Sequence, residues 1–182
     1  MNRSILSLLL LSLGLLSVGP VQAQKEEANT KKEPASNLVL YANKGKLDDV
    51  KRLIEAGTDV NSVTAGGITA LMWAIKGDEI RALLKKENAF TANHRNVIAY
   101  LLDQPQINVN LVSKNGQTAL TLALARAIKQ NDSTILDTLL KHPTINVNLK
   151  NNDGLTALKY AKQLGAEEQI IQKLIDHGAI ED

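Results

Sequence analysis

Ile107-Asn108-Val109-Asn110 and Asn115-Gly116-Gln117-Thr118-Ala119-Leu120 decide the fold, because both segments have counterparts elsewhere in the chain. Asn-Gly is a strong signal for a tight turn that needs a positive φ. Thr118 then stands where a helix would begin, and its hydroxyl can cap the open N–H groups of the first turn. The small apolar residues that follow, up to Ala125, favour a helix. The two segments therefore predict a turn that leads into a capped helix.

The same module occurs three times. It contains a Val-Asn pair, a glycine-containing turn and a Thr-Ala-Leu helix start. The step from the last Asn to the Thr is eight residues each time, from 61 to 69, from 110 to 118 and from 148 to 156. Such repetition predicts a stacked array in which each unit buries its apolar side against its neighbours.

These modules resemble the ankyrin repeat, in which Gly-x-Thr-Pro-Leu-His begins two antiparallel helices and Gly-Ala-Asp-Val-Asn leads into a β-hairpin turn. Here Thr-Ala-Leu replaces Thr-Pro-Leu, and the His position holds Met72, Thr121 and Lys159. The resemblance covers roughly residues 36–182. It implies an all-α solenoid of about four stacked helix-turn-helix repeats with β-hairpin turns. The predicted repeats are 36–68, 69–117, 118–155 and 156–182.

Two repeats are longer than the first, whose period is 33 residues (36 to 69). The second period is 49 residues (69 to 118) and the third is 38 (118 to 156). Most of the extra length in repeat two falls between its helices. We expect a helical insertion within residues 77–93, followed by a second helix from about 96 to 103. Two interpretations stay open: the insertion packs on the solenoid, or it offers a partner the apolar residues Leu83, Leu84 and Phe90.

The first 23 residues have the pattern of a Sec-type signal peptide. Arg3 precedes the mainly apolar stretch 5–18, and Val21-Gln22-Ala23 places small residues before a cut at Gln24. The apolar stretch is shorter than the ~20 residues of a spanning helix, so an uncleaved anchor is the less favoured alternative. No Cys stands at the cut, which excludes a lipoprotein signal. We expect a soluble bacterial product, periplasmic or secreted, in which the charged segment 24–35 is a disordered linker.

Little in the sequence indicates catalysis. His94, His142 and His177 lie in different repeats and form no metal-like pair. We expect His94 to be a solvated loop residue, and the other two to cap the ends of second helices, where a positive ring favours the helix dipole. The chain lacks Cys, a nucleophile elbow and a phosphate-binding loop. We therefore predict a protein that is not an enzyme and has no cofactor or metal.

Binding to another protein is the predicted role. A formal net charge of +2 and 3% aromatic residues argue against nucleic acid. Stacked helix pairs with projecting hairpins form an extended binding surface. We predict a monomeric scaffold, protector or inhibitor of another protein in the periplasm, with no membrane contact after signal cleavage. A secreted effector that engages host proteins is the alternative. The predicted partner contacts are Met72, Trp73, Lys76, Lys114, Thr121, Lys150, Asn151 and Lys159, and for Met72 and Trp73 packing between helices is the alternative.

Overall fold

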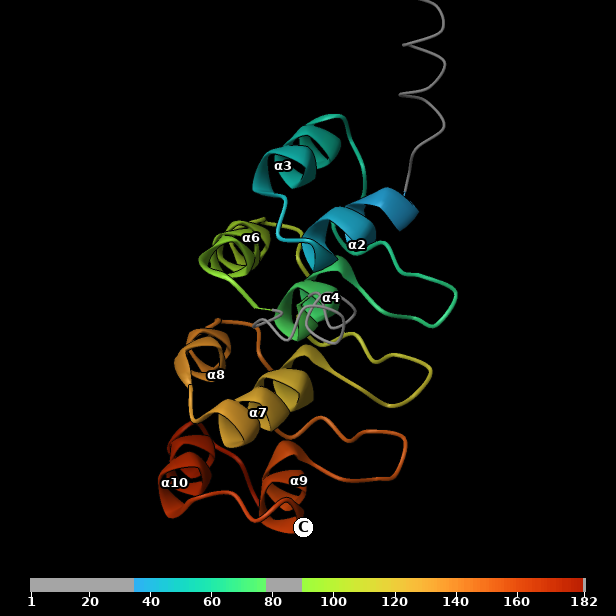
Figure 1. Ribbon diagram of the computed structural model, residues 1–182. Coiled ribbons are helices and arrows are strands. Elements are labelled where there is room, and N and C mark those ends of the chain that lie inside the picture. Colours follow the sequence, from blue (N-terminus) through green and yellow to red (C-terminus); the bar gives the residue numbers. More distant parts are fainter. Residues whose placement is uncertain (1–34, 78–89, 182) are drawn as a thin grey trace, which may run out of the picture. The chain divides into compact units, whose positions relative to one another are not determined.

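Eight helices form four antiparallel pairs in the part of the chain that the computed structural model describes, residues 35–77 and 90–181. The first helices of the pairs make one layer beside the projecting hairpins, and the second helices make another layer (Figure 1). We call these the inner and outer helices. The inner helices are α2 (Ala35–Asn43), α4 (Ala70–Lys76), α7 (Ala119–Gln130) and α9 (Ala157–Gln163). The outer helices are α3 (Leu47–Glu55), α6 (Ala92–Leu102), α8 (Thr134–Leu140) and α10 (Glu168–Asp176).

This arrangement confirms the predicted all-α repeat solenoid. Along the inner layer α2 packs on α4, α4 on α7 and α7 on α9. The predicted signal peptide (1–23) lies outside the described residues, as does the predicted linker apart from Ala35, which begins α2. None of the described helices is long and apolar enough to cross a membrane.

Three inner helices begin with the same capped turn. The hydroxyls of Thr69, Thr118 and Thr156 each accept a hydrogen bond from the backbone N–H three residues later, at 3.1, 3.0 and 3.3 Å. Each bond satisfies one of the amide groups that a helix N-terminus leaves open. The predicted helix starts at these threonines are therefore confirmed.

Hairpin fingers, defined as residues 61–69, 110–118 and 148–156, precede these helices. In each finger one residue binds the residue four positions later through its backbone N–H and a side-chain oxygen. The only β-type pairing assigned within the described residues is an isolated bridge between Val63 and Thr69, so the fingers are tight turns rather than strands. The closing pairs are Thr64 with Ile68, Ser113 with Gln117 and Asn151 with Leu155, with backbone bonds of 3.0, 2.9 and 3.0 Å.

The outer helix of repeat two corrects two predictions. It begins at Ala92, four residues before the predicted Asn96, because Thr91 and His94 form a reciprocal cap. The Nδ1 atom of His94 accepts the backbone N–H of Thr91 at 3.1 Å, and its Nε2–H donates to the carbonyl of Asn43 at 2.7 Å. His94 is 2% exposed, so it is a buried residue that links two repeats rather than a solvated loop residue.

Phe90 continues this contact towards repeat three. Its ring stacks on His94 with the centroids 5.3 Å apart, and the guanidinium of the buried Arg126 lies 3.6 Å from its centroid. Burial lowers the pKa of Arg126, and the negative charge of Asp132 acts in the opposite direction. Arg95 donates to Asp132 at 2.8 Å. We call these five residues the corner cluster.

Packing of the insertion is confirmed at Phe90, which is 4% exposed. Leu83 and Leu84 lie within residues 78–89, outside the described part of the chain. The extra residues of repeat three lengthen α7, whose Arg126 reaches Phe90. The long segments of repeats two and three therefore meet at the corner cluster.

Candidate protein-binding surface

The asparagine of each Val-Asn pair binds the backbone of the corresponding segment one repeat later and so fixes the spacing between the two segments. The Nδ2 of Asn61 donates to the carbonyl of Gln106 at 2.7 Å, and its Oδ1 accepts the N–H of Asn108 at 2.7 Å. Asn110 and Asn148 make the same pair of bonds to the following segment, at distances of 2.7 to 2.9 Å. We call these three residues the asparagine ladder. In the sequence these residues mark the repeats, but no local pattern there predicts their bonds to the following repeat.

The tips of the fingers also contact one another. The backbone N–H of Lys114 donates to the carbonyl of Gly66 at 2.9 Å, and the side chain of Asn152 donates to the carbonyl of Lys114 at 2.8 Å. Gly116 allows this approach, because a Cβ there would lie 2.8 Å from the backbone nitrogen of Asn152. The fingers are therefore held at fixed spacing while the side chain of Lys114 stays exposed.

A row of partly exposed apolar side chains runs along the inner helices. Trp73, Leu122 and Tyr160 each stand four residues after a capping threonine and are partly buried against the core. Leu40, one period of 33 residues before Trp73, is 43% exposed. We call these four residues the inner row. Only Trp73 of this row was predicted as a partner contact, although the shared position after each threonine was a signal for the other members.

Two predicted partner contacts lie in the interior and are corrected. Met72 is 1% exposed and Thr121 is 9% exposed. Both stand three residues after the capping threonine, where the side chain turns inward, and the Thr121 hydroxyl is bonded to Thr118. Lys159 has the same position but stays partly exposed, because no described inner helix packs on the far side of α9.

The other predicted contacts lie at the surface, and their role in binding stays a prediction. Trp73 is partly exposed, and the ammonium of Lys76 lies 5.0 Å from its ring centroid. Its indole N–H is buried and has no hydrogen-bond partner among the described residues. Lys150 is exposed on a finger. The side-chain oxygen of Asn151 accepts two backbone N–H groups of its own finger, so it shapes the tip.

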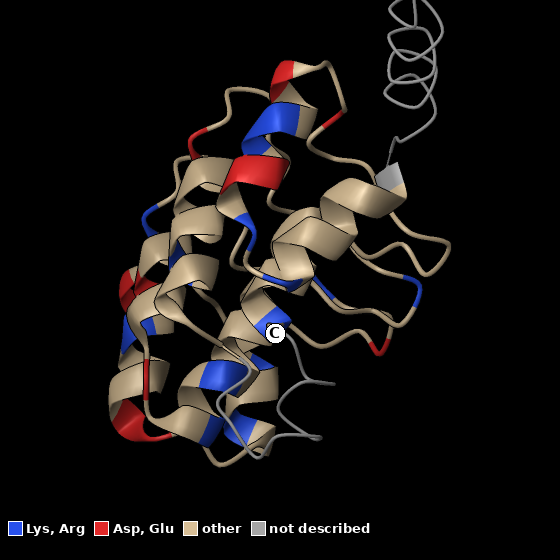
Figure 2. Ribbon diagram, turned by 45° about the horizontal axis from the view of Figure 1, so that its top comes forward, with Lys and Arg blue, Asp and Glu red and all other residues tan. Residues whose placement is uncertain are grey.

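Acidic residues distinguish the outer helices from the inner helices, while both layers carry basic residues. The inner helices contain no Asp or Glu, whereas outer helices carry acidic residues, as Figure 2 shows in red. The basic residues of the inner helices are Lys76, Arg126, Lys129, Lys159 and Lys162. The acidic residues of the outer helices are Asp48, Asp49, Glu55, Asp137, Glu168 and Asp176.

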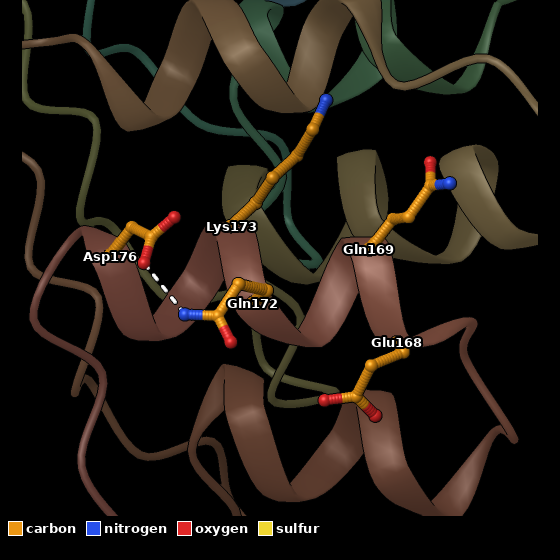
Figure 3. Close-up of a pocket in the computed structure, with 5 residues that line it drawn as sticks. All are labelled: Glu168, Gln169, Gln172, Lys173 and Asp176. Atoms are coloured by element: carbon orange, nitrogen blue, oxygen red, sulfur yellow. Dashed lines mark hydrogen bonds between the residues drawn. The ribbon is translucent and has the colours of Figure 1, made fainter.

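One hollow on the outer side is lined by the side chains of a single helix, α10 (Figure 3). There Gln172 donates to Asp176 at 2.7 Å, and Lys173 turns away to pair with Asp137 at 2.6 Å. Within residues 35–77 and 90–181 no three His, Asp or Glu side chains gather as metal ligands would.

The two remaining histidines lie at the ends of outer helices. His177 donates from Nδ1 to the carbonyl of Lys173 at 2.7 Å, which is the predicted capping of a helix C-terminus. His142 follows α8, and its Nδ1 accepts from the Thr144 backbone N–H at 3.4 Å instead. Each ring therefore makes a local bond on the outer side.

A family model described as ankyrin repeats, in three copies, matches residues 38–126. The match begins in α2 and ends in α7, so it includes the first two helix pairs and most of the third inner helix. No curated protein shows significant similarity to the chain. Ankyrin repeats are generally non-catalytic modules that bind other proteins. The described chain is therefore an ankyrin-repeat solenoid, and the matched model supports an ankyrin-repeat family.

Proposed function

We propose that a bacterium exports this chain and that it binds another protein in the periplasm through its hairpin fingers and inner helices. It acts there without catalysis, as a scaffold, protector or inhibitor. The observation that supports this best is the inner row, which keeps apolar side chains partly exposed along successive repeats. Apolar groups that gather on one face of a soluble protein commonly mark a site of interaction.

The asparagine ladder and the stacked finger tips support the same proposal. They hold the surface in one conformation before a partner arrives. A partner then orders few side chains on binding, and this lowers the entropic cost of association. Trp73 and Tyr160 supply the aromatic anchors that dominate many interfaces, and exposed lysines on the fingers form a polar rim.

Cell fractionation tests the location, which rests on the signal-peptide pattern of residues 1–23. The tagged chain is expected in the periplasmic fraction, with a processed N-terminus at Gln24. Recovery in the medium or in a host cell would instead support the secreted effector. Retention in the cytoplasm with Met1 intact would refute export.

A pull-down from periplasmic extract tests the binding surface. The purified chain is expected to recover a specific protein, and a variant with Trp73→Ala and Tyr160→Ala is expected to lose it. A matched control, Ile175→Ala, removes an exposed apolar side chain from the outer helix α10 and should retain the partner. Circular dichroism must show the same helix content in all three proteins. Equal recovery by the inner-row variant would move the binding site away from the inner helices.

A further inference from the structure

We propose that the partner presents an acidic segment with interspersed apolar residues, whose carboxylates pair with lysines beside the inner row. This inference rests on the proposed function, because it names the chemistry of the partner for that same surface. The lysines are Lys114 on the second finger and Lys159 and Lys162 on α9. Together with the inner row they make up what we call the inner face.

The first support is the charge of the inner face. Its helices carry basic residues and no acidic ones, while acidic residues lie on outer helices. Within the described residues neither Lys114 nor Lys159 forms a close ion pair with a carboxylate. A basic surface attracts acidic segments and repels the same basic surface of a second copy. This favours an acidic partner over a second copy docked through its own inner face.

The second support is a carboxylate of the chain itself. Glu181, after the last helix, pairs with the ammonium of Lys162. That hydrogen bond, the charge of Lys162 and the nearby charge of Lys159 all lower the pKa of Glu181. The lysines of α9 therefore already hold one carboxylate in this structure. A carboxylate of the partner would take the place of Glu181 at the same ammonium group.

The inner row decides between an acidic protein and a nucleic acid. Leu40 and Leu122 are aliphatic and cannot stack on bases as aromatic platforms do. The formal net charge of the chain is only +2, which is small for a protein that neutralises many phosphates. A segment that alternates acidic and apolar residues instead matches both the lysines and the row.

Peptide titration tests the inference, with Trp73 as the reporter because it is the only tryptophan of the chain. The probes are a short peptide in which Glu alternates with Leu, a matched peptide with Gln in place of Glu, and a single-stranded oligonucleotide. The Glu peptide is expected to change the Trp73 emission and to bind about tenfold tighter than the Gln peptide at low salt. Added salt should remove most of that difference.

A pair of variants locates the charges. Lys114→Glu with Lys159→Glu should weaken binding of the Glu peptide about tenfold, since two attractive charges become repulsive. Glu is tolerated at position 159, which lies in the first turn of α9, where acidic residues are favourable. The control, Lys44→Glu with Lys141→Glu, changes the net charge equally at exposed sites outside the inner face and should bind normally. Glu181→Gln should tighten binding about twofold, because it removes the internal competitor.

Several results would overturn the inference. They are absence of binding by the Glu peptide, equal affinity for the Glu and Gln peptides, equal losses in the two lysine pairs, or tighter binding of the oligonucleotide at the inner face. Failure of the proposed function is a separate result. If the pulled-down protein needs Trp73 and Tyr160 but tolerates reversal of Lys114 and Lys159, the proposed function stands and the acidic partner is wrong.

Discussion

The two edges of the solenoid join neighbouring repeats in opposite ways. At the finger edge, the asparagine ladder uses the same residue and the same two bonds at each step between repeats. At the opposite edge, the corner cluster uses Phe90, His94 and Arg126, none of which recurs at an equivalent position in another repeat. One edge is built by repetition, and the other by a single set of unlike contacts.

This difference predicts how stability is distributed. Neighbouring repeats stabilise one another through their shared interfaces. At the finger edge, three similar hydrogen-bonded sites therefore each contribute part of the stabilising free energy. The corner cluster joins repeats one, two and three through one aromatic ring and its neighbours. Damage to the corner cluster should therefore cost more free energy of unfolding than loss of any one member of the asparagine ladder.

Phe90→Ala gives the largest expected effect. It removes a buried ring and leaves a cavity between His94 and the guanidinium of Arg126, so the free energy of unfolding should fall by about 3–5 kcal/mol. Urea denaturation followed by circular dichroism measures the change. Phe90→Leu keeps most of the volume and loses the stacking, so it should cost less. A loss below about 1 kcal/mol for Phe90→Ala would show that the corner does not hold the repeats together.

Asn110→Ala should have an intermediate effect. It removes two interrepeat hydrogen bonds in the middle of the array, and at about 1 kcal/mol for each bond the loss is about 2 kcal/mol. Asn148→Ala is the matched control, because it removes the same two bonds nearer the end of the described chain. There the terminal residues can open locally, so the loss should be smaller. Equal losses at both positions would contradict this graded picture of the asparagine ladder.

Gly116→Ala and Gly154→Ala separate backbone conformation from interrepeat contact. Both glycines have a φ of +74°, which a residue with a Cβ adopts at a cost of about 1 kcal/mol. At Gly116 the new Cβ would also lie 2.8 Å from the backbone nitrogen of Asn152, whereas at Gly154 it would meet nothing within 4 Å. Thermal unfolding should therefore show the lower Tm for Gly116→Ala. Equal Tm values for the two variants would mean that the second and third fingers move apart at no cost to accommodate the new Cβ at position 116.

The finger edge was largely predictable from the sequence, and the corner was not. The eight-residue step from Asn61 to Thr69 and its two repetitions located the turns and the helix starts, because those positions depend on local backbone chemistry. The corner depends on contacts between residues far apart in the chain, such as His94 with Asn43 and Phe90 with Arg126. No local pattern encodes such contacts, so His94 was expected in solvent.

The binding surface was predictable only in part. Sequence position placed Trp73 and the finger lysines at the surface, but it did not distinguish the third residue after the capping threonine from the fourth. The structure shows that the third position is buried at Met72 and Thr121, while the fourth position forms the inner row. Whether a side chain on a stacked helix is buried depends on which neighbouring helices pack over it. The repeat pattern alone does not show which helices those are.

Asp132→Asn gives the smallest expected effect, and it tests whether the stability that the corner cluster contributes depends on pH. Hydrogen bonds from the side chain and backbone of Thr134, with a further contribution from Arg95, lower the pKa of Asp132 from 3.8 to about 2. A lowered pKa means that the carboxylate stabilises the fold above pH 4 and loses this contribution as the pH falls through about 2.

Because the ion pair of Asp132 with Arg95 is partly exposed, we expect Asp132→Asn to lower the free energy of unfolding by only about 1 kcal/mol at neutral pH. Urea midpoints measured between neutral pH and pH 2 should converge for the two proteins as the carboxylate of Asp132 is neutralised. The control is Asp49→Asn, which breaks an exposed ion pair with Arg52 on the outer helix α3 and should change the midpoint little at neutral pH. A constant difference between Asp132→Asn and the unmodified chain down to pH 2 would mean that the amide loses packing rather than charge, and that the ion pair with Arg95 contributes little to the corner.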